Sequence, residues 1–201
     1  MASSSSLAQK TITLPVPSTA GAHSLEDVIA RRRSIRTLKS APLGWGDIGQ
    51  LLWSAQGITE PKEGLRTTPS AGALYPLELY VATPDGVYHY RAKTHDLVPT
   101  GTRDVRADLR KAALDQECMD APCVILMTGI YERVTQKYPD IGKICVDFEV
   151  GHCAQNVLLQ VVALGLAAVP VAAFKPERVK DIFALPAEEV PLYMIPVGRE
   201  K

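Results

Sequence analysis

The sequence has no excess of charge of either sign, no long uninterrupted apolar stretch and few cysteines. Lysine plus arginine equals aspartate plus glutamate, at 22 each, so no overall basic surface is available to hold a polyanion. The longest apolar stretch, residues 157–174, is interrupted by Gln160, Gly165 and Pro170, whereas a membrane span needs about 20 consecutive apolar residues. These absences argue against a nucleic-acid partner and against a membrane-spanning protein.

The four cysteines form no C-x-x-C motif and no histidine cluster accompanies them, so we expect no metal site. We expect reduced thiols packed as small hydrophobic side chains at Cys118, Cys123, Cys145 and Cys153. The first ten residues are serine-rich and lack the basic start and the apolar stretch of a secretory signal. They therefore predict a cytoplasmic protein.

With 201 residues, 46% of them hydrophobic, the chain has the usual size of a single domain. Residues 1–23 contain Pro15 and Pro17 and show no helical period. We expect them to form an extended arm that lies on the domain or across a partner, with its first ten residues mobile. Residues 24–201 are expected to form one domain.

Helices are expected wherever apolar residues recur with helical spacing. Ser24 followed by Asp27 has the form of an N-cap with an acid three residues later, which predicts a helix to about residue 33. A second helix is expected at residues 47–56, closed by Gly57 in the left-handed region. Further helices are expected at residues 104–117, 141–164 and 176–183.

Strands are expected where apolar and polar residues alternate. Residues 77–83 and 87–90 alternate on either side of a Pro-Asp-Gly turn, which predicts a β-hairpin. Residues 122–129 and 192–197 are two further expected strands. Helices and strands are mixed without regular βαβ alternation, so the fold class is predicted to be α+β.

The long expected helix carries four polar side chains on one face, at spacings of three, four and four: Glu149, His152, Asn156 and Gln160. Hydrogen bonds within the core or across a subunit interface would satisfy such a stripe. The alternative is that His152 takes a direct part in chemistry.

Residues 31–36 place four arginines and a serine at the end of the first expected helix. Basic residues at a helix C-terminus are consistent with a favourable interaction with the helix dipole or with an anion site. Two segments of small residues, 69–76 and 165–174, are consistent with ordinary connections or with loops whose amides approach a ligand closely.

Six stretches of the sequence form an ordered set: SLED…RRSIR (24–36), LLWSAQG (51–57), R…PSAGALYPLELY (66–80), EVGHCAQN (149–156), GL…VPV…F (165–174) and LY…PVG (192–198). In these stretches and their order, from about residue 12 to residue 199, the chain resembles the FMN-dependent nitroreductase superfamily. The resemblance is closer to the SagB-type branch, which includes dehydrogenases that oxidise azoline rings to azoles in modified peptides.

This resemblance implies a nitroreductase-like α+β fold, with a mixed or antiparallel central sheet flanked by helices. It also implies an intertwined homodimer with FMN at the subunit interface. Residues implied to contact phosphate and ribityl are Arg32, Arg33 and Ser34, with Arg36 near the pyrimidine side of the ring and Arg199 or Lys201 completing the phosphate site. Guanidiniums suit a phosphate because they donate two parallel hydrogen bonds.

The same resemblance implies that both small-residue segments contact the flavin. The loop implied to reach the flavin from the neighbouring subunit consists of Ser70, Ala71, Gly72, Ala73 and Leu74. Pro170 and Val171 would shape the ring pocket, and the amides of Ala172 and Ala173 would face the edge near N5. Many members of the family have a glycine at one of these two positions. The methyl groups of the alanines in this chain are therefore expected to narrow the access to the face of the flavin.

The resemblance implies an oxidoreductase that transfers hydride to or from FMN, with a small-molecule or peptide substrate. The chain has no G-x-G-x-x-G motif, so NADH or NADPH would act as a transient reductant at the flavin. Lys137 and Tyr138 match a catalytic pair implicated in proton removal, although an exposed loop pair is equally consistent with their position. The alternative function is a flavin-binding subunit of a peptide-modifying, cyclodehydratase-type complex without turnover of its own.

Overall fold

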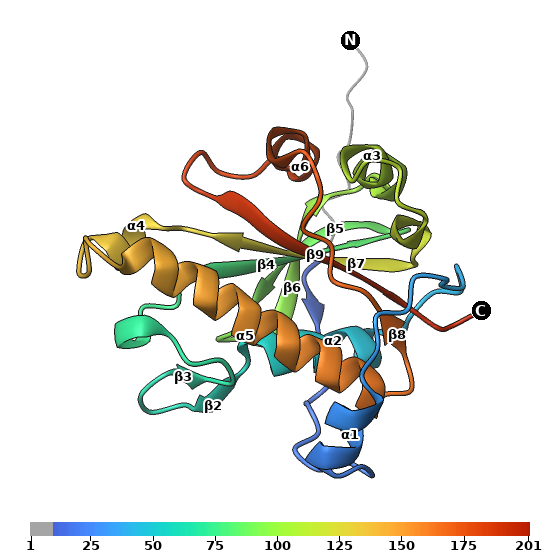
Figure 1. Ribbon diagram of the computed structural model, residues 1–201, viewed down its shortest axis with the longest axis horizontal. Helices are drawn as coiled ribbons and strands as arrows, with labels where there is room; N and C mark the ends of the chain where they lie inside the picture. Colours follow the sequence, from blue (N-terminus) through green and yellow to red (C-terminus); the bar gives the residue numbers. More distant parts are fainter. Residues whose placement is uncertain (1–9) are drawn as a thin grey trace.

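The computed structural model describes residues 10–201, and residues 1–9, to which the predicted mobility of the arm mainly refers, lie outside the described residues. A seven-stranded sheet, with every pairing antiparallel, has the order β1-β6-β5-β4-β7-β9-β8 (Figure 1). Its strands are β1 (Ile12–Thr13), β4 (Leu77–Thr83), β5 (Gly86–Arg91), β6 (Asp96–Gly101), β7 (Cys123–Gly129), β8 (Ala167–Ala168) and β9 (Val190–Gly198). A separate hairpin joins β2 (Ile58–Glu60) to β3 (Leu65–Arg66).

Helices cover both faces of the sheet, which confirms the α+β class with an antiparallel sheet flanked by helices. They are α1 (Leu25–Arg31), α2 (Trp45–Gln56), α3 (Arg106–Ala112), α4 (Glu132–Thr135), α5 (Gly142–Ala163) and α6 (Pro176–Phe183), with 3-10 turns η1 (Ala71–Ala73) and η2 (Glu117–Asp120). In residues 10–201, no helix is long and apolar enough to span a bilayer.

The side chains of β7 alternate between two cores because successive residues of a strand point to opposite faces. Ile125 and Met127 belong to the core beneath α2 and α5. Val124 and Leu126 belong to the core beneath α3 and α6. A strand that is buried on both faces has a continuous apolar sequence, as residues 123–127 do.

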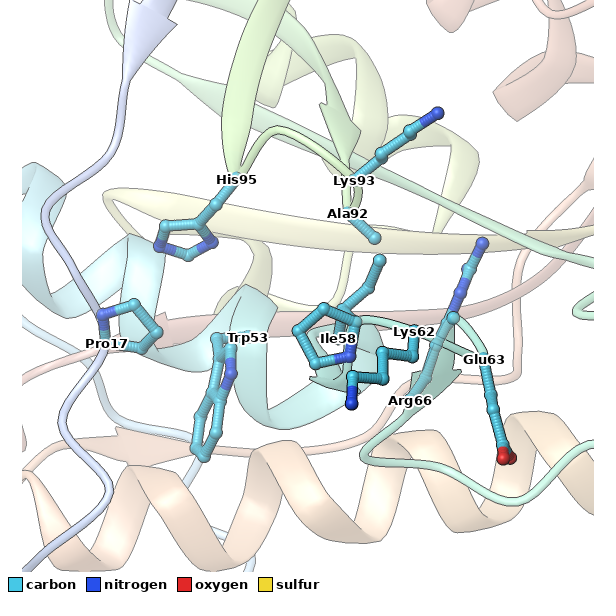
Figure 2. Close-up of a pocket in the computed structure, with 11 residues that line it drawn as sticks. Pro17, Trp53, Ile58, Lys62, Glu63, Arg66, Ala92, Lys93 and His95 are labelled. Carbon is cyan, nitrogen blue, oxygen red and sulfur yellow. The ribbon is translucent and has the colours of Figure 1, made fainter.

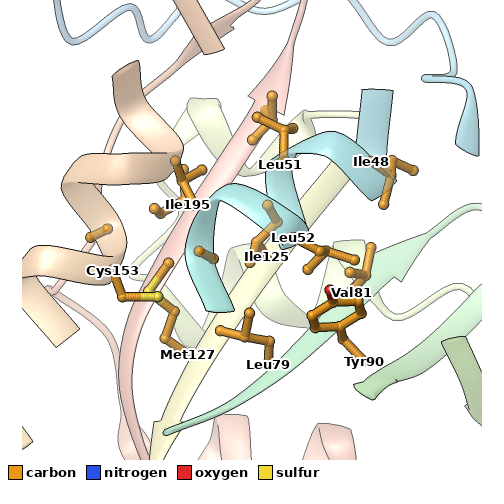
Figure 3. Close-up of a cluster of buried hydrophobic side chains, with 14 of the residues drawn as sticks. Ile48, Leu51, Leu52, Leu79, Val81, Tyr90, Ile125, Met127, Cys153 and Ile195 are labelled. Carbon is orange, nitrogen blue, oxygen red and sulfur yellow. The ribbon is translucent and has the colours of Figure 1, made fainter. Parts of the chain in front are cut away.

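Helix α2 is anchored by leucines that are fully buried. Leu51 and Leu52 have no exposed surface, and Figure 3 shows them beside Ile125 and Ile195 of the central strands. Each leucine buried in this way contributes about 1.5–3 kcal/mol relative to an exposed one. This core fixes α2 and α5 against the same face of the sheet and so positions the segments that connect to them.

The predicted N-cap is confirmed, because the amide of Asp27 donates to Ser24 Oγ at 3.2 Å. The helix is shorter than predicted, since Arg32 leaves the helical conformation with φ −56° and ψ 121°. The prediction of a helix over residues 104–117 is wrong at both ends. Leu114 and Asp115 have φ of 58° and 59°, a left-handed pair through which an α-helix does not continue.

Gly57 ends α2 as predicted, but the prediction of a left-handed conformation is wrong because its φ is −62°. The structure shows a different need for glycine at this position. A Cβ here would lie 2.1 Å from Cδ1 of Trp53 and 2.6 Å from its carbonyl oxygen. Close packing against Trp53, rather than backbone conformation, excludes a side chain.

Strand β6 is absent from the sequence prediction because Pro99 interrupts it. The short strand β1 pairs only with Asp96 and Leu97, so the outer edge of β6 is unpaired after Leu97. Pro99 lies on this unpaired edge, where its missing N–H breaks no hydrogen bond to a neighbouring strand. Strand β1 belongs to the arm, and the amide of Ser18 donates to Gln50 at 2.8 Å. The described part of the arm therefore lies along the domain of its own chain.

Candidate functional site

Residues 31–36, called here the arginine segment, begin at the last residue of α1. Their arginine side chains fall into two groups, those with partners in the chain and those without. Arg31 turns back to Asp27 at 2.9 Å, and Arg33 donates to the carbonyls of Ala30 and Arg32 at 3.1 and 2.7 Å. The guanidiniums of Arg32 and Arg36 form no hydrogen bond or ion pair with any residue in the range 10–201. Arg32 is half-buried and Arg36 is exposed. These two cations are therefore available to a ligand.

The C-terminal residues lie directly beside this segment. Lys39 N donates to the Arg199 carbonyl at 2.7 Å, and Lys201 N donates to the Thr37 carbonyl at 3.1 Å. Ile35 N donates to the Ala168 carbonyl at 3.0 Å, which joins the segment to β8. The Arg199 side chain is 56% exposed, and its nearest carboxylate oxygen, on Asp47, is 4.0 Å away. The structure thus places Arg199 opposite Lys39, three residues after Arg36.

The segment after β8 presents two free backbone amides. Val171 exchanges hydrogen bonds with Met194 of β9 at 2.8 and 3.0 Å, which fixes the chain just before Ala172. Ala172 and Ala173 are exposed, and their amides donate to no acceptor within the described residues. These two amides can donate hydrogen bonds to an oxygen or nitrogen atom of a ligand that fits beside the two alanine methyl groups.

The loop of residues 70–74 is exposed at its tip and held in an unusual conformation. Gly72, Ala73 and Tyr75 have φ of 60°, 55° and 46°, so three of four consecutive residues are left-handed. The loop is closed by the Tyr75 amide, which donates to Ser70 Oγ at 2.8 Å. Strained exposed loops of this kind recur at ligand-binding sites.

Lys137 and Tyr138 lie against the tip of that loop. A Cβ added to Gly72 would lie 2.9 Å from Tyr138 Oη and 3.1 Å from Lys137 Nζ. Arg133, just before the pair, donates to the Tyr75 carbonyl at 3.0 Å and so joins this segment to the end of the loop. The structure thus brings Gly72 together with the Lys137–Tyr138 pair, more than sixty positions later in the sequence.

The two halves of the predicted site do not meet within one chain. The loop of residues 70–74 lies toward the N-terminal end of α5, whereas α1 and β8 lie at its C-terminal end (Figure 1). A 22-residue helix is about 33 Å long. The residues implied to bind phosphate and those implied to cover the ring are therefore separated along α5.

The polar stripe of α5 faces the interior at Glu149, which is 2% exposed. Gln56 Nε2 donates to one carboxylate oxygen of Glu149 at 3.4 Å, and the other oxygen has no partner within residues 10–201. Burial raises the pKa of Glu149, while Ser70, Gln56 and Arg66 act in the opposite direction. The sequence drew attention to Glu149 but not to this connection with the loop at Ser70.

Two further members of the stripe are satisfied within the chain. Asn156 donates to Thr68 Oγ1 at 3.2 Å, and Gln160 accepts from Gln50 at 3.3 Å. His152 is exposed and has no polar partner among the described residues. These hydrogen bonds give Asn156 and Gln160 a structural role and give none to His152.

The four cysteines are unpaired, and three of them are buried. Burial raises the pKa of the Cys123 thiol to about 12, which keeps it protonated at neutral pH. In the part of the chain that the structure describes, no group of three or more histidine, cysteine, aspartate or glutamate side chains is arranged to hold a metal.

Comparison with known proteins identifies the family. The model of the nitroreductase family matches residues 29–199. A protein of Methanocaldococcus jannaschii assigned as a nitroreductase is 42% identical over 183 residues, which cover 88% of this chain and 91% of that protein.

Solved structures show the same fold. A Ralstonia eutropha protein, also assigned as a nitroreductase, has a TM-score of 0.87 at 26% identity, covering 97% of this chain and 91% of that one. The Escherichia coli microcin synthetase McbBCD complex with truncated pro-MccB17 bound contains a chain with a TM-score of 0.77 at 23% identity, covering 96% and 79%, a likeness of fold alone. The family match and the 42% identical relative together show that this chain belongs to the nitroreductase family.

Proposed function

We propose that the chain is an FMN-dependent oxidoreductase that acts as a homodimer. The observation that carries the proposal is the cluster of uncommitted donors beside β8. Arg32 and Arg36 have no partner in the described residues, and Arg199, whose backbone pairs with Lys39, has only one carboxylate near it, on Asp47 at 4.0 Å. An anionic cofactor would supply the charge that this cluster lacks.

The donors present fit the phosphate of FMN. A phosphate monoester has a charge of about −1.5 to −2 at neutral pH and three strong acceptor oxygens. Arg32, Ser34 and Arg199 would hold it, because guanidiniums and a hydroxyl are suitable donors. Arg36 would supply a fixed positive charge for the pyrimidine side of the ring, and the amides of Ala172 and Ala173 would serve its opposite edge.

A second copy of the chain would complete the site. The loop of residues 70–74 is too far along α5 to cover a ring held near β8 of the same chain. Large apolar side chains are exposed on α1 and α5, with exposed fractions of 61% at Leu25, 54% at Ile29, 53% at Ile144 and 62% at Phe148. Apolar surface of this kind marks an interface, and an obligate dimer would bury more than about 2,000 Å².

The bound cofactor would supply hydride transfer, in a cycle in which one substrate donates a hydride and another accepts it. Lys137 would accept the proton that a substrate C–H or N–H loses, with Tyr138 beside it. Because Lys137 and Tyr138 contact Gly72, they would lie beside the cofactor of the partner chain wherever the loop of residues 70–74 covers it. This role corresponds to the SagB-type dehydrogenases, whose substrates are azoline-containing peptides.

The test uses the purified full-length protein. We expect a yellow protein that releases FMN on denaturation and oxidises NADH or NADPH with menadione or a nitroaromatic as acceptor. A colourless protein that takes up no added FMN would contradict the proposal. A yellow protein without turnover would instead favour the flavin-binding subunit of a peptide-modifying complex.

A further inference from the structure

A cavity of about 730 Å³ lies between the β2–β3 hairpin, the turn from β5 to β6 and Pro17 of the arm (Figure 2). Small-molecule sites usually have volumes of about 300–1,000 Å³. None of the residues assigned above to flavin binding or proton transfer lines this cavity. It is therefore a separate candidate site.

One end of the cavity is a narrow apolar slot. Figure 2 shows the rings of Trp53, His95 and Pro17 gathered there, with Ile58 beside them. The His95 ring is held in place, because its Nε2 lies 3.0 Å from the Pro15 carbonyl and its Nδ1 lies 2.9 Å from a tyrosine hydroxyl. Walls made of fixed rings favour a flat ligand.

Charged groups line the other end. Three cations, Lys62, Arg66 and Lys93, are opposed by one acid, Glu63, although the chain as a whole has no net charge. Figure 2 shows the Glu63 carboxylate and the Lys93 ammonium pointing away from the slot, while the Lys62 ammonium extends toward Trp53. The charged group that extends toward the slot in Figure 2 is therefore a cation, Lys62.

Arg66 is the least solvated of these cations, and although Glu78 and Glu149 act on it electrostatically, neither forms a direct ion pair with it. One terminal nitrogen donates to Gln56 at 3.1 Å, and the guanidinium lies 4.5 Å from the centre of the Tyr75 ring. Within residues 10–201 it forms no ion pair with a carboxylate, and its Nε is buried without a partner. Burial lowers the pKa of Arg66, which is the expected effect of desolvating a cation. A bound carboxylate would offset that desolvation.

We propose that this cavity binds an aromatic carboxylate, with its ring in the slot beside Trp53 and its carboxylate received by Arg66 and Lys62. The second terminal nitrogen of Arg66 and the ammonium of Lys62 provide one donor each for the two oxygens of a carboxylate. A neutral ligand of the same shape would fill the slot but would give Arg66 and Lys62 no direct ion pair.

The test is isothermal titration calorimetry of the full-length protein saturated with FMN, using 2-naphthoate and its neutral analogue 2-naphthamide. Naphthoate should bind at least tenfold more tightly than the amide. Lys62→Ser should weaken naphthoate about two- to fivefold, as expected for a partly exposed ion pair. Arg66→Gln should weaken it about tenfold or more.

Lys111→Ser is the matched control, because Lys111 is an exposed cation on α3, far from the lining of this cavity. It should leave both affinities unchanged. Circular dichroism checks the folding of Arg66→Gln, and Lys62→Ser decides the question if that variant does not fold. Equal binding of acid and amide, equal effects of Lys62→Ser and Lys111→Ser, or displacement of FMN by naphthoate would each overturn the assignment.

Discussion

Gly72 is where the loop of residues 70–74 contacts Lys137 and Tyr138, so Gly72→Ala tests whether that contact serves the reaction. The added Cβ would lie 2.9 Å from Tyr138 Oη and 3.1 Å from Lys137 Nζ, so both polar ends must move. A positioned proton-transfer group contributes about 10²–10⁴-fold to a rate, and displacement loses part of this. We expect turnover that requires proton removal to fall by about ten- to a hundredfold.

The same substitution also strains the backbone, since Gly72 has φ +60°. An alanine in the left-handed region costs about 1–2 kcal/mol, or about 2–8 °C in Tm for a chain of this length. Gly64 is the matched control, because it has φ +70° and an added Cβ would meet no atom within 4 Å. Gly64→Ala therefore imposes similar backbone strain without moving a polar side chain.

Both variants are compared with the parent protein for FMN content, Tm, quinone reduction by NADPH and oxidation of an azoline-containing peptide. The two should have similar Tm values, retain FMN and reduce quinones alike. Only Gly72→Ala should lose azoline oxidation. If the two variants oxidise the peptide equally well, or if Gly72→Ala loses quinone reduction to the same extent, the reasoning about the Lys137–Tyr138 contact is refuted.

Three further outcomes are expected. Arg32→Ala should raise the Kd for FMN by about one to two powers of ten, because a charge-assisted hydrogen bond of about 1.5–3 kcal/mol is lost. Arg31→Ala should change this Kd little, because Arg31 is already paired with a carboxylate. Equal effects of the two substitutions would remove Arg32 from the site. Light scattering should give twice the 21.8 kDa chain mass, and Phe148→Asp, unlike Leu114→Asp at another exposed apolar residue, should shift it toward one chain. Lys137→Ala should retain FMN and quinone reduction while losing substrate oxidation that requires C–H deprotonation; loss of FMN would contradict a catalytic role.

Those parts of the fold whose cause is local could be predicted from the sequence. The long helix is predicted within one residue at each end, because its apolar pattern extends over six turns. The hairpin at residues 77–90 is predictable because its turn is formed by the local sequence Pro84-Asp85-Gly86. Strand β6 could not be predicted, because whether Pro99 is tolerated depends on how far β1 pairs along its edge. The break after α3 likewise depends on two left-handed residues, neither of which is a glycine.

The candidate site is predictable in its parts but not in its arrangement. Motif residues identify donors and a small-residue loop, yet only the structure shows that α5 separates them. On α5, Glu149 is buried against the domain, whereas Ile144 and Phe148 are exposed. A helix that only covered its own sheet would have no need for a second apolar face. The proposed dimer would account for both features, because the loop of residues 70–74 of a partner chain would cover a cofactor held near β8 of this one and the exposed apolar residues would be buried between the chains.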